Sequence, residues 1–370
     1  MLKVVEVKTR QELRCFVRFP DRLYKGCAQY VPALHSDEMR SLTEAAPLHY
    51  CKLRLWMVYD GRKPVGRMGA MINPRYNELY GRKYVRFCWF DCVNDIEVAR
   101  LLFDSAEAWA REEGMTQIHG PLHYDTLGRQ GMLVEGYENV PPFNCPYNFP
   151  YYNDLVTSLG FVKECDWLQY KVVANHGVPD KARRVAKMVM ERYPLHLGNL
   201  DELSKDPEQV RRFFRMVNES LYSEVYHFVP LTEAEIEEKV RKVVPFLSDK
   251  ASSVILDSDG RMVAFGISFP SRSEALRKAK GHLFPLGWLY LLRARHNYET
   301  TDLIVSGAVP EWRNTGISAV YYREMANKAA KIGNRRAITS PQVESSCAVN
   351  IWNSYEREPY MRRRCYIKNI

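Results

Sequence analysis

The pattern of apolar and polar positions predicts two successive sets of strands and helices in the same order. In the first half, the predicted strands lie at 4–7, 55–59, 64–72, 84–92, 116–119 and 166–173, and the helices at 11–24, 95–113 and 151–159. In the second half, the strands lie at 195–200, 252–257, 261–269, 303–305 and 335–340, and the helices at 181–193, 207–221, 232–246, 317–332 and 344–357. Each half has a hairpin around an Asp-Gly pair, at 60–61 and 259–260, and turn formers at 175–180 mark the join. The chain is therefore predicted to be an α/β protein with mixed sheets and tandem domains at 1–176 and 177–370.

Composition and charge narrow the class of protein. A chain of 370 residues with 46% hydrophobic residues can bury a sizeable core. Its net charge of +9 suits an anionic partner, such as CoA phosphates, nucleic acid or an anionic membrane face. No zinc-finger, RRM or helix-turn-helix signature supports nucleic acid, so none is expected as a partner.

The cysteines and the hydropathy of the chain indicate its cellular compartment. The nine cysteines form no C-x-x-C pair, so neither a metal site nor a disulfide framework is expected. The N-terminus is charged from the third residue, and no stretch of about 18 apolar residues occurs. We expect a cytoplasmic protein; contact with the inner membrane face is left open, and so is the oligomeric state.

The junction after the strand at 303–305 carries the most specific chemistry. Pro310 cannot donate to a strand ladder, and Gly316 lets backbone approach a ligand closely. A helix that begins at Gly316 offers unpaired N–H groups to a pyrophosphate, and Arg313 adds a planar cation. The residues predicted to bind the cofactor are Val309, Arg313, Asn314, Thr315, Gly316, Ile317 and Ser318. An ordinary strand–turn–helix with a surface arginine is the alternative interpretation.

This junction resembles the acyl-CoA pyrophosphate loop of the GNAT N-acyltransferase superfamily, V-x-P-x-x-R/Q-x-x-G-x-G/A. It departs from that pattern because Val309 directly precedes the proline and Ser318 replaces the small Gly or Ala. The resemblance implies two GNAT-like domains, each a twisted, mostly antiparallel sheet flanked by helices with a splayed central strand pair. It also implies acetyl-CoA or a longer acyl-CoA as donor, an amine as acceptor and no metal.

Further blocks resemble a bacterial group of tandem-GNAT proteins. They lie at 65–67, 72–78, 120–121, 131–137, 147–152 and 160–161, with Lys163, Asp166 and Tyr170. That group includes ceramide-synthase-type enzymes, so the resemblance implies a long-chain or sphingoid amine as acceptor. The same glycines and tyrosines can also serve only turns and packing.

The two halves differ at the equivalent junction. After the strand at 84–92, the segment 93–97 has no glycine or arginine and carries carboxylates where phosphates would lie. Only the C-terminal half is therefore predicted to hold the cofactor. The first half is expected to be structural or to help bind the acceptor.

Candidate catalytic residues follow from the chemistry of N-acyl transfer and from the resemblance. GNAT enzymes commonly place a tyrosine near the CoA sulfur, which implies Tyr355 as the acid and Asn350 as a cofactor contact. Asp302 and Glu344 are the candidate bases; the alternative interpretation is that both are surface charges and that Tyr355 is a half-buried packing residue. His119 and His123 rank below them, because a lone histidine is more often structural.

Two further segments have open interpretations. Residues 281–295 form an apolar segment with basic flanks, which suits a fatty-acyl channel, an anionic membrane surface or a buried helix. The cluster at 362–364, three arginines, suits a phosphate, lipid headgroups or a solvated tail.

The function predicted from these features is acyl-CoA-dependent N-acyl transfer to a long-chain or lipid amine. Alternatives of the same fold are a small-molecule or protein N-acetyltransferase and an aminoacyl-tRNA-dependent transferase. A non-enzymatic basic membrane-binding adaptor is the alternative from another class.

Overall fold

The computed structural model describes residues 1–125, 128–173, 177–221, 225–346 and 348–370. They form two compact units: unit 1 holds Met1–Trp167, Ser273–Leu291 and Met361–Ile370, and unit 2 holds Leu168–Arg272 and Leu292–Tyr360. Each unit contains residues from both predicted halves. The predicted join begins within 174–176, outside the described residues, so the boundary at 176 stays a prediction.

The sheet of unit 1 has the order β1-β2-β3-β4-β5-β14, with β6 beside β14. Its strands are β1 (Leu2–Glu6), β2 (Lys52–Asp60), β3 (Lys63–Ile72), β4 (Tyr84–Cys92), β5 (Gln117–Gly120), β6 (Met132–Glu135) and the end of β14 (Arg357–Asn369). Neighbours are antiparallel except β4 and β5, which are parallel over only three residue pairs, ending at Arg86↔His119. An extra residue on β4 near Trp89, whose φ is 47°, bulges the strand against β3.

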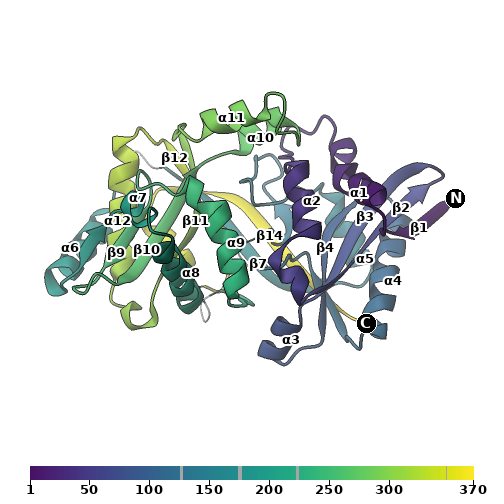
Figure 1. The fold of residues 1–370 in the computed structure, drawn as a ribbon, viewed down its shortest axis with the longest axis horizontal. Coiled ribbons are helices and arrows are strands. Elements are labelled where there is room, and N and C mark those ends of the chain that lie inside the picture. Colours follow the sequence, from purple (N-terminus) through teal and green to yellow (C-terminus); the bar gives the residue numbers. More distant parts are fainter. Residues whose placement is uncertain (126–127, 174–176, 222–224, 347) are drawn as a thin grey trace. The chain divides into compact units, whose positions relative to one another are not determined.

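Helices cover both faces of this sheet (Figure 1). On one face, α1 (Arg10–Leu23) and α2 (His35–Thr43) enclose a core that includes Phe16, Leu42 and Met57. On the other, α4 (Ile96–Glu112) and α5 (Tyr151–Ser158) pack on a second core. The helix α3 (Pro74–Tyr80) follows β3.

The sheet of unit 2 repeats this plan in the order β7-β12-β11-β10-β9-β8. Its strands are β7 (Val162–Val173, from Leu168), β8 (His196–Gly198), β9 (Ser253–Leu256), β10 (Met262–Pro270), β11 (Thr300–Ala308) and β12 (Arg336–Ile338). The short β13 (Gln342–Val343) pairs with β7. The parallel pair is β11 and β12, and all other ladders described by register are antiparallel.

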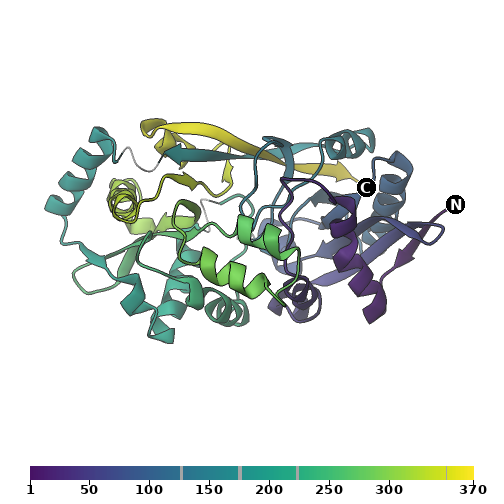
Figure 2. The same ribbon diagram turned by 90° about the horizontal axis from the view of Figure 1, so that it is seen from above.

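Helices also lie on both faces of the unit 2 strands (Figure 2). A Cβ at Gly266 would meet Met325 of α12 (Ile317–Lys331), so α12 covers one face. A Cβ at Gly307 would meet Ser220 of α8 (Pro207–Leu221), so α8 lies on the other, where it packs with α9 (Glu233–Val243). The helix α6 (Asp180–Arg192) packs beside α12 in both views (Figures 1 and 2).

The structure corrects the sequence-based elements near the C-terminus. The helix predicted at 344–357 is wrong: α13 (Ala348–Ile351) and the turn η4 (Trp352–Ser354) are short, and Tyr355 is already extended. Residues 357–369 form β14, which the sequence analysis missed because its basic residues do not alternate with apolar ones. Among the described residues, no helix is both long and apolar enough to cross a membrane.

Candidate functional site

The central feature of unit 2 is the separation of its parallel strands. Residues of β11 and β12 pair only from Thr300↔Arg336 to Asp302↔Ile338. In the ladder with β10, Ile267 faces Val305 and Ser268 faces Leu303, so Ile304 is an extra, bulged residue on β11. This is the splayed strand pair that the resemblance implied.

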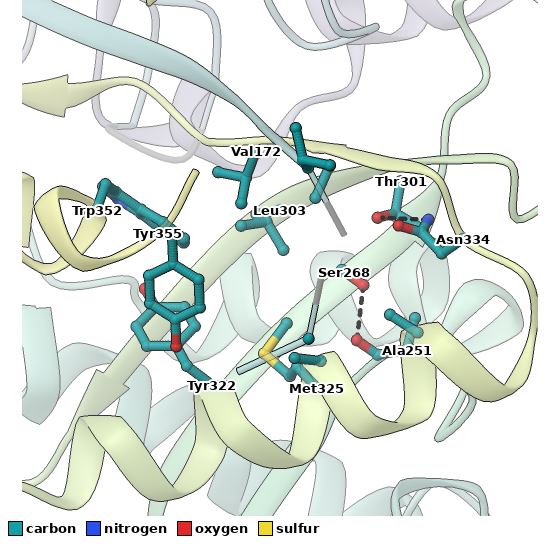
Figure 3. Close-up of a pocket in the computed structure, with 15 residues that line it drawn as sticks. Val172, Ala251, Ser268, Thr301, Leu303, Tyr322, Met325, Asn334, Trp352 and Tyr355 are labelled. Atoms are coloured by element: carbon teal, nitrogen blue, oxygen red, sulfur yellow. Dashed lines mark hydrogen bonds between the residues drawn. The ribbon is translucent and has the colours of Figure 1, made fainter. Parts of the chain in front are cut away.

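An apolar pocket lies on the α12 side of these strands (Figure 3). From α12 it is lined by Tyr322, Met325, Ala326 and Ala329, which share one helical face. The two alanines leave room that larger side chains would fill. The remaining lining residues are Val172, Val173, Gly177, Ala251, Ser268, Thr301, Leu303, Asn334, Ala337, Trp352 and Tyr355.

Most polar groups of the pocket already have partners, but the Tyr355 hydroxyl does not. Asn334 donates to the Tyr298 carbonyl at 2.7 Å, and the Tyr322 hydroxyl lies 2.9 Å from that of Ser306. The Tyr355 hydroxyl oxygen is buried and has no hydrogen-bond partner among the described residues. Burial also raises the pKa of Tyr355, which keeps the phenol protonated at neutral pH.

Asp302 lies on the opposite face of β11 from this pocket. Its ladder partner is Phe269, whereas the flanking Thr301 and Leu303 face the pocket. Only 2% of Asp302 is exposed, and neither carboxylate oxygen accepts a well-formed hydrogen bond from a described residue. Burial raises the pKa of Asp302 to about 7, although Ser271 and Arg272 offset part of the effect. A carboxyl with such a pKa is suited to general-base chemistry.

The predicted phosphate loop has the backbone that its sequence suggests. Gly316 (φ 87°) and Asn314 (φ 60°) are both left-handed, and α12 starts at Ile317 without a side-chain cap. Thr315 closes the loop by donating from Oγ1 to the Trp312 carbonyl at 2.7 Å. Val309 is buried, and Ser318 lies in the first turn of α12.

Two neighbours occupy the surroundings of this loop. Arg313 donates from Nη2 to the carbonyls of Glu219 and Ser220 at 3.2 and 3.1 Å, at the C-terminal end of α8. A Cβ at Gly316 would lie 2.9 Å from Val185 of α6. The phosphate contacts of Arg313 and Gly316 therefore stay predictions. To bind a phosphate, Arg313 would have to release the α8 carbonyls, and the loop would have to move away from Val185.

The other sequence candidates lie apart from the pocket. Glu344 is exposed on the turn after β13, and Asn350 is exposed on α13. Neither is among the residues that line the pocket around Tyr355. The structure thus brings Tyr355 to the α12 side and Asp302 to the α8 side of the separated strands, and their roles stay predictions.

In unit 1, the arginines at 362–364 and the two candidate histidines lie among partners within the fold. Arg363 is fully buried and donates to the Pro146 carbonyl. Arg362 and Arg364 both pair with the buried Asp166, so these arginines are not a solvated tail. His119 is buried 3.2 Å from a Glu164 oxygen, and burial lowers the pKa of His123 to about 3.

Unit 1 contains a polar cavity, called the unit 1 cavity, that no sequence motif predicted. Two adjoining hollows on the α1–α2 side share Arg67, Asp91, Arg129, Pro146 and Tyr147. Four of the family-like blocks, 65–67, 120–121, 131–137 and 147–152, contribute to its walls. The sequence signal was present in those blocks, but nothing in their spacing placed them around one cavity.

Solved structures identify the fold that both units share. No family model matches the chain. A tandem GNAT protein from the clavulanic acid biosynthesis pathway has a TM-score of 0.58 with 12% identity, and covers 100% of this chain and 98% of its own. A GCN5-related N-acetyltransferase from Sphaerobacter thermophilus gives 0.54 with 9% identity, covering 99% and 95%. The chain therefore has the tandem GNAT fold, as the sequence predicted.

Relatives by sequence narrow the comparison to bacterial proteins. Protein YghO of Escherichia coli K12 is 26% identical over 372 residues, which cover 98% of this chain and 94% of that protein. The bacterial ceramide synthase of Caulobacter vibrioides is 27% identical over 296 residues, covering 79% and 76%. This chain has the tandem GNAT fold and is similar in sequence to both proteins.

Proposed function

We propose that the chain is an acyl-CoA-dependent N-acyltransferase whose transfer chemistry takes place in unit 2. The observation that carries the proposal is Asp302, a buried carboxyl with a pKa of about 7 at the last residue of β11 that pairs with β12. A structural carboxylate would be expected to have enough hydrogen bonds and nearby positive charge to offset burial, whereas Ser271 and Arg272 offset only part of its effect on Asp302. The tandem GNAT fold supports the reaction class.

In the proposed reaction, Asp302 and Tyr355 each transfer one proton. Asp302 accepts the proton that the amine loses as its nitrogen attacks the thioester carbonyl. The amide C–N bond forms, the C–S bond breaks, and Tyr355 donates its proton to the leaving sulfur. The proton on Asp302 and the phenolate of Tyr355 then equilibrate with solvent, so the cycle needs no further reagent.

We propose a long-chain or lipid amine as the acceptor. The name of the Caulobacter relative, a bacterial ceramide synthase, supports this choice. An exposed apolar segment supports it physically: Phe284, Leu286 and Trp288 are 73%, 53% and 46% exposed. They lie at and before α11 (Gly287–Ala294), a helix in which Gly287 is the buried residue.

This segment suits an anionic lipid surface. Lys278 and Lys280 precede it and Arg293 and Arg295 follow it, all exposed. Apolar side chains flanked by cations bind the interface of anionic membranes. Replacing Phe284, Leu286 and Trp288 together by Ser should abolish co-sedimentation with phosphatidylglycerol vesicles without lowering the free energy of unfolding. Unchanged co-sedimentation would refute the membrane contact.

The first test of the function is ligand-induced thermal stabilisation. CoA, acetyl-CoA and a long-chain acyl-CoA below its micellar concentration would each be added to the wild type and to Arg313→Ala. At about 100 times its dissociation constant, a ligand stabilises the fold by roughly 2.7 kcal/mol. We expect the largest shift with the long-chain acyl-CoA and a much smaller one in the variant.

The control tests whether the loss of any surface arginine of unit 2 lowers the ligand shift. Arg335 is an exposed arginine of unit 2 whose guanidinium lies 3.6 Å from Glu299, so Arg335→Ala removes a surface charge at no proposed site. Its ligand shift should equal that of the wild type. Equal shifts for acetyl-CoA would favour a small-substrate N-acetyltransferase. No shift with any of the three compounds would contradict the enzyme and favour the membrane adaptor.

A further inference from the structure

We propose that unit 1 holds a Zn²⁺ ion between His119 of β5, Glu164 of β7 and Cys365 of β14. All three residues belong to unit 1, which includes β7 as far as Trp167. The transfer chemistry proposed for unit 2 uses none of them. The sequence-based expectation of no metal rested on the lack of a C-x-x-C pair, whereas these ligands come from three strands that are distant in the sequence.

The three side chains place their ligand atoms close together. One ligand atom of each residue lies within 4.8 Å of the other two. Oε2 of Glu164 is 3.2 Å from Nδ1 of His119 and 3.1 Å from Sγ of Cys365. In a tetrahedral zinc site, the usual bond lengths place nitrogen and oxygen ligands about 3.3 Å apart, and sulfur and oxygen ligands about 3.6 Å apart. Shifts of about half an ångström would therefore make room for the ion.

Each group either has the protonation state that coordination needs or reaches it by losing one proton. Burial lowers the pKa of His119, although Glu164 offsets part of the effect, so the imidazole is neutral at pH 7. Burial raises the pKa of Cys365, so its thiol is protonated in the absence of metal. The ion displaces that proton to solvent and binds the thiolate. Imidazole and thiolate ligands favour Zn²⁺ over Mg²⁺ and Ca²⁺, which prefer oxygen.

Cys165 and Arg86 complete the surroundings of the three ligands. The Cys165 thiol is a hydrogen-bond neighbour of Cys365 and is 7% exposed, so it is available for the fourth position of a tetrahedral ion. Two thiolates and the Glu164 carboxylate would exceed the charge of the ion by one. Arg86 balances that excess, because its guanidinium is buried and acts electrostatically on both Cys365 and His119.

Aromatic rings shield the site from water but leave an approach to it. The ring centroid of Tyr84 lies 4.8 Å from that of His119, edge-on, and the ring centroid of Tyr76 lies 5.6 Å from it. Such a shell lowers the local dielectric and strengthens the attraction between an ion and its ligands. The Glu164 side chain is 12% exposed, so an ion can reach the ligands from that side.

A hydrogen-bonded cluster without metal explains the arrangement less well. The contact between His119 and Glu164 would by itself be an ordinary pairing of a buried histidine. The two thiols add little to such a cluster, because S–H is a weak donor. Sulfur beside an imidazole and a carboxylate is instead the ligand set that a zinc ion selects.

Metal titrations of the full chain after treatment with a chelator test this site. We expect one Zn²⁺ per chain with a Kd of about 0.1 µM or tighter, measured by competition with a chromogenic chelator. Co²⁺ bound in its place should show thiolate charge-transfer absorption and the visible bands of a tetrahedral ion. Added Zn²⁺ should also raise the midpoint of thermal unfolding in a concentration-dependent way.

Cys365→Ser separates a zinc site from a hydrogen-bonded cluster. The serine hydroxyl keeps a donor for Glu164 but is a poor zinc ligand. We expect weaker charge-transfer absorption and at least about tenfold weaker zinc binding. Glu164→Gln keeps an acceptor for His119 and should also weaken binding at least about tenfold. The matched control is Cys27→Ser, the same change at a half-buried thiol of unit 1 outside the site, which should bind like the wild type.

The outcomes that would overturn the zinc site are distinct from those that bear on transfer. If Cys365→Ser fails to fold by circular dichroism, Glu164→Gln decides the question. Absence of zinc binding by the wild type, a cobalt spectrum without thiolate absorption, or unchanged binding by Cys365→Ser or Glu164→Gln would each overturn it. None of these measurements involves acyl-CoA, so the zinc site and the transferase assignment stand or fall separately.

Discussion

Asp302 should make the folded protein less stable as the pH rises. Its pKa is about 7 in the folded chain against 3.8 for an ordinary aspartate. Each pKa unit corresponds to about 1.4 kcal/mol, so ionising this carboxyl in the fold costs about 4 kcal/mol. Between about pH 4 and 7 the native state binds one more proton than the unfolded state. The free energy of unfolding therefore falls across that window because of this group.

Asp302→Asn keeps the shape of the side chain and removes the titration. We expect the variant and the wild type to have similar unfolding free energies near pH 4. Above pH 7 the variant should be more stable by as much as about 4 kcal/mol. Urea denaturation at several pH values measures this directly. A difference that stays constant from pH 4 to 8 would refute the burial argument.

The same variant should lose transferase activity, since a base is expected to contribute about 100-fold or more to the rate. The wild-type kcat/KM should rise with pH through about 7, following the ionisation of Asp302. A stabilised but inactive variant is the expected signature of a functional group held in an unfavourable site. A variant that is stabilised and fully active would leave Asp302 buried but without a role as the base.

Three further variants test other parts of the fold. Tyr355→Phe should leave stability unchanged, because the lost hydroxyl has no partner, and lower kcat about 100-fold in an acyl-transfer assay. Asp166→Asn should lower the free energy of unfolding by about 1–3 kcal/mol in urea melts, because Arg362 and Arg364, whose side chains are 31% and 29% exposed, lose a charged hydrogen-bond partner. The pKa of Asp166 is lowered, since hydrogen bonds from Arg364 outweigh burial, so its stabilising effect is lost as the pH falls below about 4. Gly316→Ala should cost more stability than Gly333→Ala: both have positive φ, but only the first places a Cβ against α6, and equal losses would contradict that crowding.

Much of the fold was predictable because hydrophobic periodicity is local information. The strand Tyr84–Cys92 and the helix Pro207–Leu221 match their predicted bounds, and the Asp-Gly hairpins lie where expected. The strand β14 was not predictable, because its arginines find their partners in Asp166 and the Pro146 carbonyl, which are far away in the sequence. A periodicity argument counts an arginine as exposed and therefore misses a strand of this kind.

The candidate site also has features that the sequence could predict and features that it could not. The loop around Gly316 was predictable, since its glycine and the start of α12 are adjacent in sequence. The contact of Arg313 with the end of α8 was not predictable, because it depends on tertiary packing. Asp302 could be proposed from its position before the loop, but its burial without a well-formed hydrogen bond from a described residue and its raised pKa come from the surroundings that folding assembles.

Comparison of equivalent positions explains why unit 2 is the better candidate for transfer chemistry. The last parallel pair is Arg86↔His119 in unit 1 and Asp302↔Ile338 in unit 2, so a guanidinium stands where unit 2 has its carboxyl. Arg86 donates to the carbonyls of His123 and Tyr124, and a guanidinium cannot act as a base. In unit 1, Asp95 also caps α4 with its own carboxylate, an anion that would repel a pyrophosphate at that helix end. In contrast, α12 begins at Gly316 with no side-chain cap. The two units thus carry opposite charges at the first position, and at the second a carboxylate in unit 1 corresponds to an uncapped helix start in unit 2, which favours unit 2 as the candidate for transfer.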